Sequence, residues 1–265
     1  MKRIYPLFFV FALSLLFSAC VSDGAPRQNE TPQDDKSNEA QEQEAPDNSA
    51  RLRPEPQDRN TFSMIINDGE LELDPRLSYN ADEAQVFTGI YEGLFSYNPF
   101  TLEPVYGVAR RYELSDDKLV WTFTLREDAR YWNGDKVTAA HFRDAWLSLM
   151  EPSLEAPYSS FFDLLKGGRD YRTGRNSDPT SVGLEAPNDT TLIVTLDHPA
   201  SFFPNMLCHH SFSPIHPSQL EGGSISESFP LGNGPYFLQE RKDDRLILSK
   251  NALYWDAKNV SFTRI

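Results

Sequence analysis

The chain has 265 residues, a length that suffices for one large domain or two small ones. Its formal net charge is −14 at pH 7. This acidic balance argues against nucleic acid as a partner, because a protein that binds nucleic acid needs a basic face.

The first 19 residues are expected to be a signal peptide. Lys2 and Arg3 form a basic start, and residues 4–17 are almost wholly apolar, a run shorter than the ~20 residues of a membrane-spanning helix. Small residues then precede Cys20, a pattern that resembles a bacterial lipoprotein signal. That resemblance implies cleavage before Cys20 and a diacylglycerol group on its thiol. The alternative is an ordinary signal peptide followed by an incidental cysteine.

Residues 20–60 are expected to be a disordered tether between the membrane and the folded part. They are rich in Gln, Glu, Asp, Pro and Ser and contain almost no large apolar side chain. Such a segment cannot bury enough apolar surface to offset the entropy lost on folding. Cys208 is the second cysteine of the chain. With Cys20 lipidated it has no partner, so no disulfide framework is expected.

Two elements are predicted at the start of the folded part. Residues 61–66 read as a strand. A helix follows, with Asn80 as its N-cap, Glu83 as the capping-box partner three residues later, and Gly93 at its C′ position. The apolar face of this helix is predicted at Ala84, Phe87, Ile90 and Tyr91.

The stretch from residue 119 to residue 150 predicts a strand, a turn and an amphipathic helix. Residues 119–125 alternate between apolar and polar side chains, which is typical of a half-buried strand. Asn133 and Gly134 favour a tight turn because both tolerate a positive φ. Thr138 is a candidate N-cap, and Pro152 prevents the helix from continuing. The apolar stripe of the helix is predicted at Phe142, Ala145, Trp146, Leu149 and Met150.

Two hairpins are predicted in the remainder of the chain. Residues 181–186 and 191–196 pair across Pro187-Asn188-Asp189, and residues 237–241 and 245–250 pair across residues 242–244. Residues 167–176 between the amphipathic helix and the first hairpin read as a polar loop.

Residues 125–150, LREDARYWNGDKVTAAHFRDAWLSLM, resemble the signature of the family 5 extracellular solute-binding proteins. This family contains the oligopeptide- and dipeptide-binding components of ABC importers. His141 departs from the signature, which has an acidic residue there, and a neutral imidazole favours a helix N-terminus less than a carboxylate does. The matching positions are Leu125, Arg126, Ala129, Trp132, Asn133, Gly134, Val137, Thr138, Ala139, Phe142 and Trp146.

Other motifs extend the resemblance over residues 61–265. They are GIYEGLFSY at residues 89–97, LEPVYGVA at 102–109, GNGPY at 232–236 and NALYW at 251–255. A family member is normally about twice as long as this chain. The chain therefore resembles the N-terminal half of such a protein, apparently truncated before the second large lobe. A fragment, a truncated gene product and one half of a split gene all remain open.

The resemblance implies an α/β fold of the type II periplasmic-binding-protein kind, with mixed sheets and flanking helices. It implies a discontinuous lobe I, built from residues 61–91 and 217–265, and a lobe II built from residues 92–216. It also implies a protein with no catalytic residues and no cofactor. Such a protein traps an extended peptide between closing lobes and passes it to a permease.

By position, the resemblance implies that Tyr79, Asn80, Ala81, Tyr158 and His209 face the ligand. The alternative for Tyr79–Ala81 is a simple N-cap turn, and for Tyr158 it is packing on neighbouring phenylalanines. At the level of the whole protein, we expect a lipid-anchored importer component in the cell envelope, on the outer side of the membrane that carries it. The alternative is a truncated surface lipoprotein, such as a remnant, an antigen or an adhesin, without transport activity.

Other polar clusters favour no further chemistry. His209, His210 and His216 suggest a metal site, but adjacent histidines project apart in a strand and no acidic cluster accompanies them, so no metal is expected. Cys208 reads as a buried small apolar residue rather than as a nucleophile. A hydrolase is disfavoured, because no nucleophile–base pair is evident.

Overall fold

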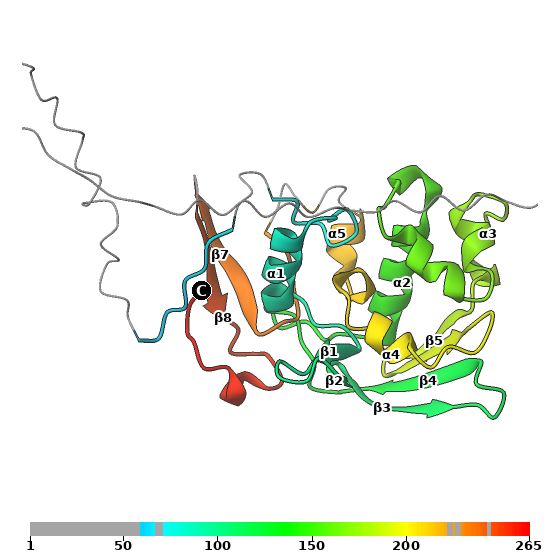
Figure 1. The fold of residues 1–265 in the computed structure, drawn as a ribbon, viewed down its shortest axis with the longest axis horizontal. Coiled ribbons are helices and arrows are strands. Elements are labelled where there is room, and N and C mark those ends of the chain that lie inside the picture. Colours follow the sequence, from blue (N-terminus) through cyan, green and yellow to red (C-terminus); the bar gives the residue numbers. More distant parts are fainter. Residues whose placement is uncertain (1–58, 67–70, 222–224, 226–228, 243–244) are drawn as a thin grey trace, which may run out of the picture. The chain divides into compact units, whose positions relative to one another are not determined.

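The structure, a computed structural model, describes residues 59–66, 71–221, 225, 229–242 and 245–265 (Figure 1). The predicted signal peptide, Cys20 and all but the last two residues of the predicted tether lie outside the described residues. None of the helices in the described ranges combines the length and the apolar composition that crossing a bilayer requires.

The architecture is α/β, with helices flanking sheets, as the sequence predicts. The named strands of the described residues all pair antiparallel. The α-helices are α1 (Ala81–Ile90), α2 (Ala139–Met150), α3 (Gly168–Arg172), α4 (Phe203–Met206) and α5 (Pro217–Glu221). Short 3₁₀ segments cover Pro152–Leu154, Ser159–Leu164, Pro179–Ser181, His210–Phe212 and Ala257–Asn259. The strands are β1 (Phe95–Tyr97), β2 (Pro104–Tyr106), β3 (Ala109–Leu114), β4 (Val120–Leu125), β5 (Leu184–Asn188), β6 (Thr191–Thr195), β7 (Tyr236–Lys242) and β8 (Arg245–Lys250).

A four-stranded sheet with the order β3-β4-β6-β5 carries the larger part of the core. Strand β4 alternates as predicted, with Trp121, Phe123 and Leu125 buried. Helix α2 follows β4 in the chain and lies over one face of this sheet (Figure 1). The backbone N–H of Ala139 fixes its first turn by donating a 2.8 Å hydrogen bond to the carbonyl of Asp189, between β5 and β6. The predicted apolar stripe of α2 is buried throughout.

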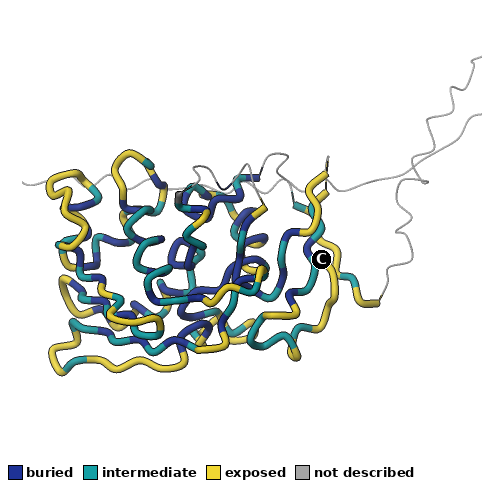
Figure 2. The backbone as a smooth tube through the Cα atoms, turned by 180° about the vertical axis from the view of Figure 1, so that it is seen from behind, coloured by how far each residue is buried: buried dark blue, intermediate teal, exposed yellow. Residues whose placement is uncertain are grey.

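Buried apolar side chains form two separate clusters. The larger draws on residues 94–225 and fills the space between the four-stranded sheet and the helices. The smaller draws on residues 71–91 and 236–248, from α1, β7, β8 and the segment before α1. Figure 2 shows the buried stretches running through the interior and the exposed ones in the peripheral loops. All described residues belong to one compact unit, and the division into two lobes stays a prediction.

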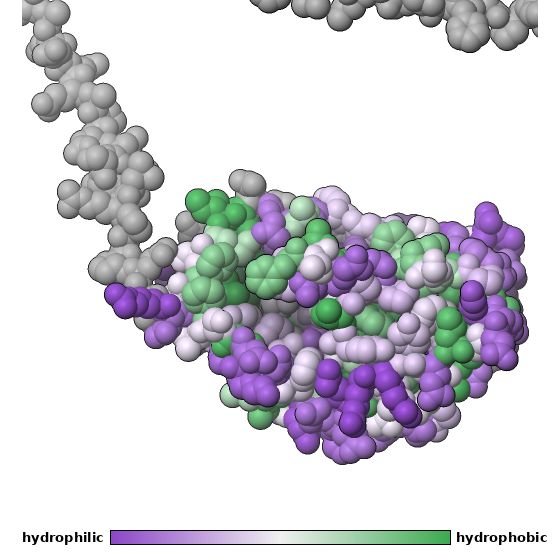
Figure 3. Space-filling view, turned by 60° about the horizontal axis from the view of Figure 1, so that its bottom comes forward, coloured by the Kyte–Doolittle hydropathy of each residue, from purple (hydrophilic) through white to green (hydrophobic). Residues whose placement is uncertain are grey.

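Strand β3 lies at the edge of the sheet and is exposed beyond its first residue. Figure 3 shows this side of the molecule, where hydrophobic groups are interspersed with hydrophilic side chains. The exposed apolar side chains of strands β1 to β3 and of the β1–β2 turn are Tyr97, Phe100, Leu102, Val105, Tyr106, Tyr112 and Leu114.

The predicted strand at residues 61–66 is wrong. Thr61 makes a single parallel bridge with Arg264, and the next amide, that of Phe62, donates to the carbonyl of Arg264 at 3.0 Å. On its other side, the segment that carries Arg264 pairs with β8, because Leu248 and Ile265 exchange two backbone hydrogen bonds of 2.9 Å. Alternating apolar character at residues 61–66 therefore marks a short sheet-edge contact and not a full strand.

Two further predictions need correction. Residues 167–176 contain helix α3 and are not only a loop. Gly93 is not the C′ residue of α1, because α1 ends at Ile90 with Tyr91 as its C-cap. Gly93 serves a close approach of chains instead, since a Cβ atom there would lie 2.7 Å from the carbonyl oxygen of Leu207. Both predicted hairpins are confirmed, as β5–β6 and β7–β8.

The predicted turn at Asn133-Gly134 forms, but the two residues contribute differently. Gly134 adopts a φ of +98°, whereas Asn133 is not among the described residues with positive φ. The Asn133 side-chain oxygen instead accepts a 3.0 Å hydrogen bond from the Asp135 amide. Three residues later, Thr138 is the N-cap of α2, and the Nδ1 atom of His141 accepts a 3.3 Å hydrogen bond from its amide. His141 thus takes over part of the role of an acidic capping residue.

Candidate functional site

The predicted segment Tyr79-Asn80-Ala81 forms the start of helix α1. Asn80 is the N-cap, and its side-chain oxygen accepts a 2.8 Å hydrogen bond from the Glu83 amide. The Glu83 carboxylate in turn accepts hydrogen bonds from the amides of Tyr79, at 3.2 Å, and Glu72, at 2.8 Å. This reciprocal capping fixes the backbone while the Tyr79 side chain remains 72% exposed. Ala81 is exposed as the first helical residue.

Tyr158 lies beside this segment. Its hydroxyl donates a 3.5 Å hydrogen bond to the carbonyl oxygen of Tyr79. Its ring meets the imidazole of His209 edge-on, with ring centroids 4.7 Å apart, and lies 5.1 Å from the ring of Phe161. The structure therefore brings Tyr79, Tyr158 and His209 together, although they come from three distant parts of the sequence. We name this group the Tyr158 cluster; it comprises Tyr79, Tyr158, Phe161 and His209.

The two adjacent histidines do not project apart as predicted. They stand at the start of a 3₁₀ turn and not in a strand, and their ring centroids are 4.1 Å apart. The Nδ1 atom of His209 accepts a 3.2 Å hydrogen bond from the Ser211 amide. Burial lowers the pKa of His209, while burial and the neighbouring His209 lower the pKa of His210 to about 3. Both imidazoles are therefore neutral near pH 7.

The Tyr158 cluster offers aromatic faces, two phenolic hydroxyls and a neutral imidazole. Groups of this kind suit the amides and apolar side chains of a neutral ligand segment better than they suit an isolated charge. Within the described ranges, no three His, Cys, Asp or Glu side chains are grouped so that they could hold a metal ion. Half-buried Cys208 has its pKa raised to about 12 by burial, which disfavours the reactive thiolate.

The interpretation of the sequence missed a second polar centre, built on Glu92. This side chain is only 6% exposed. Its carboxylate accepts hydrogen bonds from the hydroxyl of Tyr254, at 2.5 Å, and the indole of Trp255, at 2.7 Å. The Asn233 side chain bonds both backbone groups of Glu92, at 2.9 and 3.1 Å, and the Arg126 guanidinium lies 3.6 Å from the centroid of the Trp255 ring. Burial raises the pKa of Glu92 to about 7 against these two side-chain hydrogen bonds.

The Glu92 centre joins four of the motifs that carry the family resemblance. Glu92 belongs to GIYEGLFSY, Arg126 to the long signature, Asn233 to GNGPY, and the two aromatic residues to NALYW. One signal in the sequence pointed to it: a single acid inside the otherwise apolar run GIYEGLF. An acid in such a run is buried with partners when the run is buried.

Buried residues of the family signature pack against the segments that carry the site. Trp146 is fully buried, and its indole donates a 3.0 Å hydrogen bond to the carbonyl of Phe212, in the turn that begins next to His209. Phe142 meets the Trp146 ring edge-on, with centroids 6.3 Å apart. Trp132 donates a 2.9 Å hydrogen bond to Pro230 and stacks on a phenylalanine of β7. Helix α2 therefore fixes the turn that presents the Tyr158 cluster.

Comparisons with known proteins identify the family of the chain. Residues 103–265 match the family model described as "Bacterial extracellular solute-binding proteins, family 5 Middle". The chain is 33% identical over 201 residues to the periplasmic murein peptide-binding protein MppA of Escherichia coli, covering 74% of this chain and 37% of that protein. It is 34% identical over 207 residues to the periplasmic oligopeptide-binding protein OppA of Salmonella typhimurium, covering 75% and 38%.

Solved structures show the same fold. The E. coli murein tripeptide-binding protein MppA superposes with a TM-score of 0.70 at 31% identity, over 75% of this chain and 40% of that one. Listeria monocytogenes OppA bound to peptide gives a TM-score of 0.69 at 30% identity, again over 75% and 40%. The chain thus spans about two-fifths of the length of these relatives. With the family model matching more than half of its residues, the chain belongs to the bacterial extracellular solute-binding proteins of family 5.

Proposed function

We propose that the protein is the substrate-binding component of a peptide ABC importer, which captures oligopeptides outside the cytoplasmic membrane for a permease. Family 5 consists of binding proteins and not of enzymes. The relatives MppA and OppA are named as peptide-binding proteins, and both are named as periplasmic. The observation that carries the proposal is the Tyr158 cluster, where an exposed tyrosine, a hydroxyl and a neutral imidazole meet at the start of α1.

The chemistry of this cluster favours recognition of the peptide backbone. A hydroxyl and a neutral imidazole exchange hydrogen bonds with amide groups, which every peptide carries whatever its sequence. Among the described residues, the Tyr158 hydroxyl makes a single long hydrogen bond, of 3.5 Å, to the carbonyl of Tyr79. A ligand carbonyl that offers a shorter bond can replace it. The aromatic faces of Tyr158 and Phe161 then provide contact for ligand side chains without selecting one of them.

We further propose that the protein is held at the outer face of a membrane by acyl chains on Cys20. The support is the basic, apolar and small-residue pattern of residues 1–20. Each buried methylene of an acyl chain contributes about 0.8 kcal/mol, so several chains anchor a protein firmly. Metabolic labelling with radioactive palmitate should mark the chain, and the variant Cys20→Ser should lose both the label and the membrane fraction.

The ligand proposal is tested by thermal unfolding with and without a mixture of tri- to pentapeptides. A ligand that binds only the folded state raises its stability, so peptide should raise the Tm of the unaltered chain. Tyr158→Phe keeps the ring but removes the hydroxyl and should reduce this rise. Tyr112→Phe, at a half-exposed tyrosine of β3, is the matched control and should retain it.

Two other results would contradict the proposal. A cooperative transition that is indifferent to peptide would favour a surface lipoprotein without transport activity. An equal response of the Tyr158 and Tyr112 variants would place peptide binding elsewhere on the molecule.

A further inference from the structure

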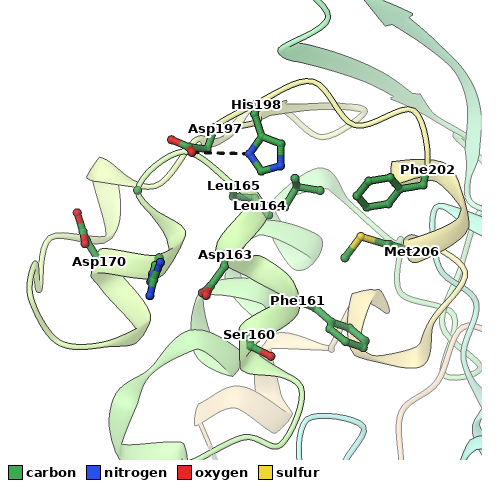
Figure 4. Close-up of a pocket in the computed structure, with 12 residues that line it drawn as sticks. Ser160, Phe161, Asp163, Leu164, Leu165, Asp170, Asp197, His198, Phe202 and Met206 are labelled. Atoms are coloured by element: carbon green, nitrogen blue, oxygen red, sulfur yellow. Dashed lines mark ion pairs between the residues drawn. The ribbon is translucent and has the colours of Figure 1, made fainter. Parts of the chain in front are cut away.

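Apolar side chains of the described residues reach solvent both in a hollow and along a strand edge. The hollow, of about 550 Å³, is lined by the 3₁₀ segment Ser159–Leu164, helix α3 and helix α4 (Figure 4). The strand edge is β3, on the side of the molecule that Figure 3 shows. A concave pocket suits a small ligand, whereas an open strand edge suits another strand. Strand β3 is therefore the better candidate surface for a partner chain.

The outer edge of β3 carries backbone groups without a strand partner. Strand β3 pairs with β4 on one side, and within the described ranges no strand lies on its other side. The amide of Ser115, directly after β3, donates a 3.0 Å hydrogen bond to the carbonyl of Val120, so it points toward β4. The direction of the backbone groups alternates along a strand. The N–H and C=O groups of Tyr112 and Leu114 therefore point away from β4, toward the open edge.

The side chains of β3 lie on two faces of the sheet. Tyr112 lies on the core side, where its ring centroid is 4.9 Å from that of Trp121. Arg111 lies on the other side, where its Nε atom donates a 3.2 Å hydrogen bond to the hydroxyl of Thr124. Glu113 shares that side, but the 3.7 Å between its carboxylate and the Arg111 guanidinium is too long for a hydrogen bond. These two side chains are 65% and 72% exposed, so both charges can pair with a neighbouring strand.

We propose that β3 pairs with β3 of a second copy of this chain, antiparallel and about a two-fold axis at Tyr112. Outward-pointing backbone groups must meet outward-pointing groups, so the axis has to lie at a residue and not between two residues. Axes at residues 110, 111 and 113 set Arg110, Arg111 and Glu113, respectively, against their own copies. The axis at Tyr112 instead sets Arg111 of each copy opposite Glu113 of the other. Charge therefore selects this register.

The proposed pairing adds hydrogen bonds and apolar contact to the two ion pairs. The two copies of Tyr112 exchange two backbone hydrogen bonds, and their rings, each 37% exposed, lie side by side. Arg111 and Glu113 of opposite copies become direct cross-strand neighbours, an arrangement that stabilises a sheet, whereas like charges there destabilise it. An edge of six residues buries a small area, so we expect a reversible dimer that forms as the protein concentration rises.

Charge reversal at the two paired positions tests the register. In Arg111→Glu and in Glu113→Arg, like charges face each other twice in the dimer, so the dissociation constant should rise at least tenfold. Both side chains are exposed, so these variants should fold normally. Combining the two substitutions in one chain should restore the dimer. An equimolar mixture of the two single variants should form a mixed dimer, because each meets the other with opposite charge. Sedimentation velocity of the full chain over a concentration series measures each case.

A disulfide tests the position of the axis. An axis at Tyr112 brings its two copies to about 5.5 Å between Cα atoms, within the range that a disulfide spans. Tyr112→Cys should therefore give a disulfide-linked dimer under mild oxidation. Leu114→Cys is the matched control, because Leu114 is 38% exposed on the same strand, but its two copies lie about 13 Å apart along the strand direction. Cross-linking of Tyr112→Cys should be at least tenfold faster than that of Leu114→Cys or of the unaltered chain.

Three results would overturn the proposal. They are an unaltered chain that stays monomeric over the whole concentration series, a doubly substituted chain that dimerises no better than the single variants, and equal cross-linking of Tyr112→Cys and Leu114→Cys. The proposal does not depend on peptide binding, because no member of the Tyr158 cluster lies on β3. Tyr158→Phe should therefore dimerise like the unaltered chain, so the two proposals can fail separately.

Discussion

The indole N–H of Trp255 donates a 2.7 Å hydrogen bond to the carboxylate of Glu92, 163 residues earlier in the chain. The same carboxylate accepts from the hydroxyl of Tyr254. Both donors are neutral, and the charge of nearby Arg126 has a smaller effect on the pKa of Glu92 than burial does. The Glu92 carboxyl is held by hydrogen bonds more than by charge, and because burial raises its pKa to about 7, its protonation changes near neutral pH.

Stability should fall as the pH rises from about 4.5 to about 7. Burial raises the pKa of Glu92 from 4.5 to about 7 in the folded chain, so in this window the folded state keeps a proton that the unfolded state has lost. The full shift corresponds to about 3 kcal/mol at most. In Glu92→Gln this pH-dependent part of the free energy of unfolding should vanish. Urea denaturation of the unaltered chain and of Glu92→Gln at pH 5 and pH 7.5 would test this.

Other groups titrate over the same range, so the control is a second glutamate. Glu127 is exposed, and Glu127→Gln should leave the pH dependence of the unaltered chain in place. Equal pH slopes for the unaltered chain and Glu92→Gln would contradict the role assigned to the Glu92 carboxyl.

Gly232→Ala should lower the free energy of unfolding by about 3 kcal/mol through overpacking. A Cβ atom at Gly232 would lie 2.0 Å from the carbonyl oxygen of Ile90, at the end of α1. Gly134→Ala is the matched comparison, because its Cβ would meet nothing closer than 3.8 Å and only the φ of +98° opposes it. The free energy of unfolding of Gly134→Ala should fall by about 1 to 2 kcal/mol. Guanidinium denaturation of both variants would test the ranking, and a larger loss in Gly134→Ala would refute it.

Trp146→Ala should lower the free energy of unfolding by about 3 to 5 kcal/mol. It removes the largest fully buried side chain among the described residues and opens a cavity. Trp146→Phe should cost less, since it keeps a ring but leaves the carbonyl of Phe212 without its indole donor. Phe100→Ala, at 93% exposure, should stay within about 0.5 kcal/mol of the unaltered chain. Urea midpoints with constant m-values would establish the order, and a small loss in Trp146→Ala would argue against this core.

Asn80→Ala should lower stability by about 1 kcal/mol through loss of the N-cap, whereas Asn80→Ser should lose only a part of this. The Asn80 side-chain oxygen accepts from the Glu83 amide, and serine offers an oxygen to the same donor. Thermal unfolding of the two variants would separate the capping effect from any other change at this position. Equal losses in both would mean that the Asn80 side chain acts through other contacts.

The parts of the fold that the sequence predicted are those with a local physical cause. The alternation of Trp121, Phe123 and Leu125 predicts β4, and the period of the apolar positions from Phe142 to Met150 predicts α2. The cap at Asn80 follows from hydrogen bonds within four residues. Each of these signals lies inside the element that it specifies, so no knowledge of distant contacts is needed.

The predictions that the structure corrects concern residues whose conformation depends on contacts between distant segments. Residues 61–66 look like a strand, but within the described part of the chain Thr61 makes an isolated bridge with Arg264 and no strand forms. His209 and His210 look like strand residues in the sequence. In the structure they begin a 3₁₀ turn, and the carbonyl of Phe212 in this turn accepts a hydrogen bond from the Trp146 indole. The resemblance to family 5 named Tyr79, Tyr158 and His209 as ligand-facing residues, and the structure brings these three together. Their role in binding stays a prediction.

The long separation between Glu92 and its partners has a consequence for synthesis. Helix α1 and the turn after it leave the ribosome before Asn233, Tyr254 and Trp255 have been made. Until these residues emerge, they cannot donate hydrogen bonds to the Glu92 carboxylate. Burial of the carboxylate would then be unfavourable, so we expect it to stay exposed to water. The larger apolar cluster, from residues 94–225, is complete earlier. We therefore expect the nascent chain to assemble in two stages, with the contacts around Glu92 made last, and pulsed hydrogen exchange on stalled chains would show the order.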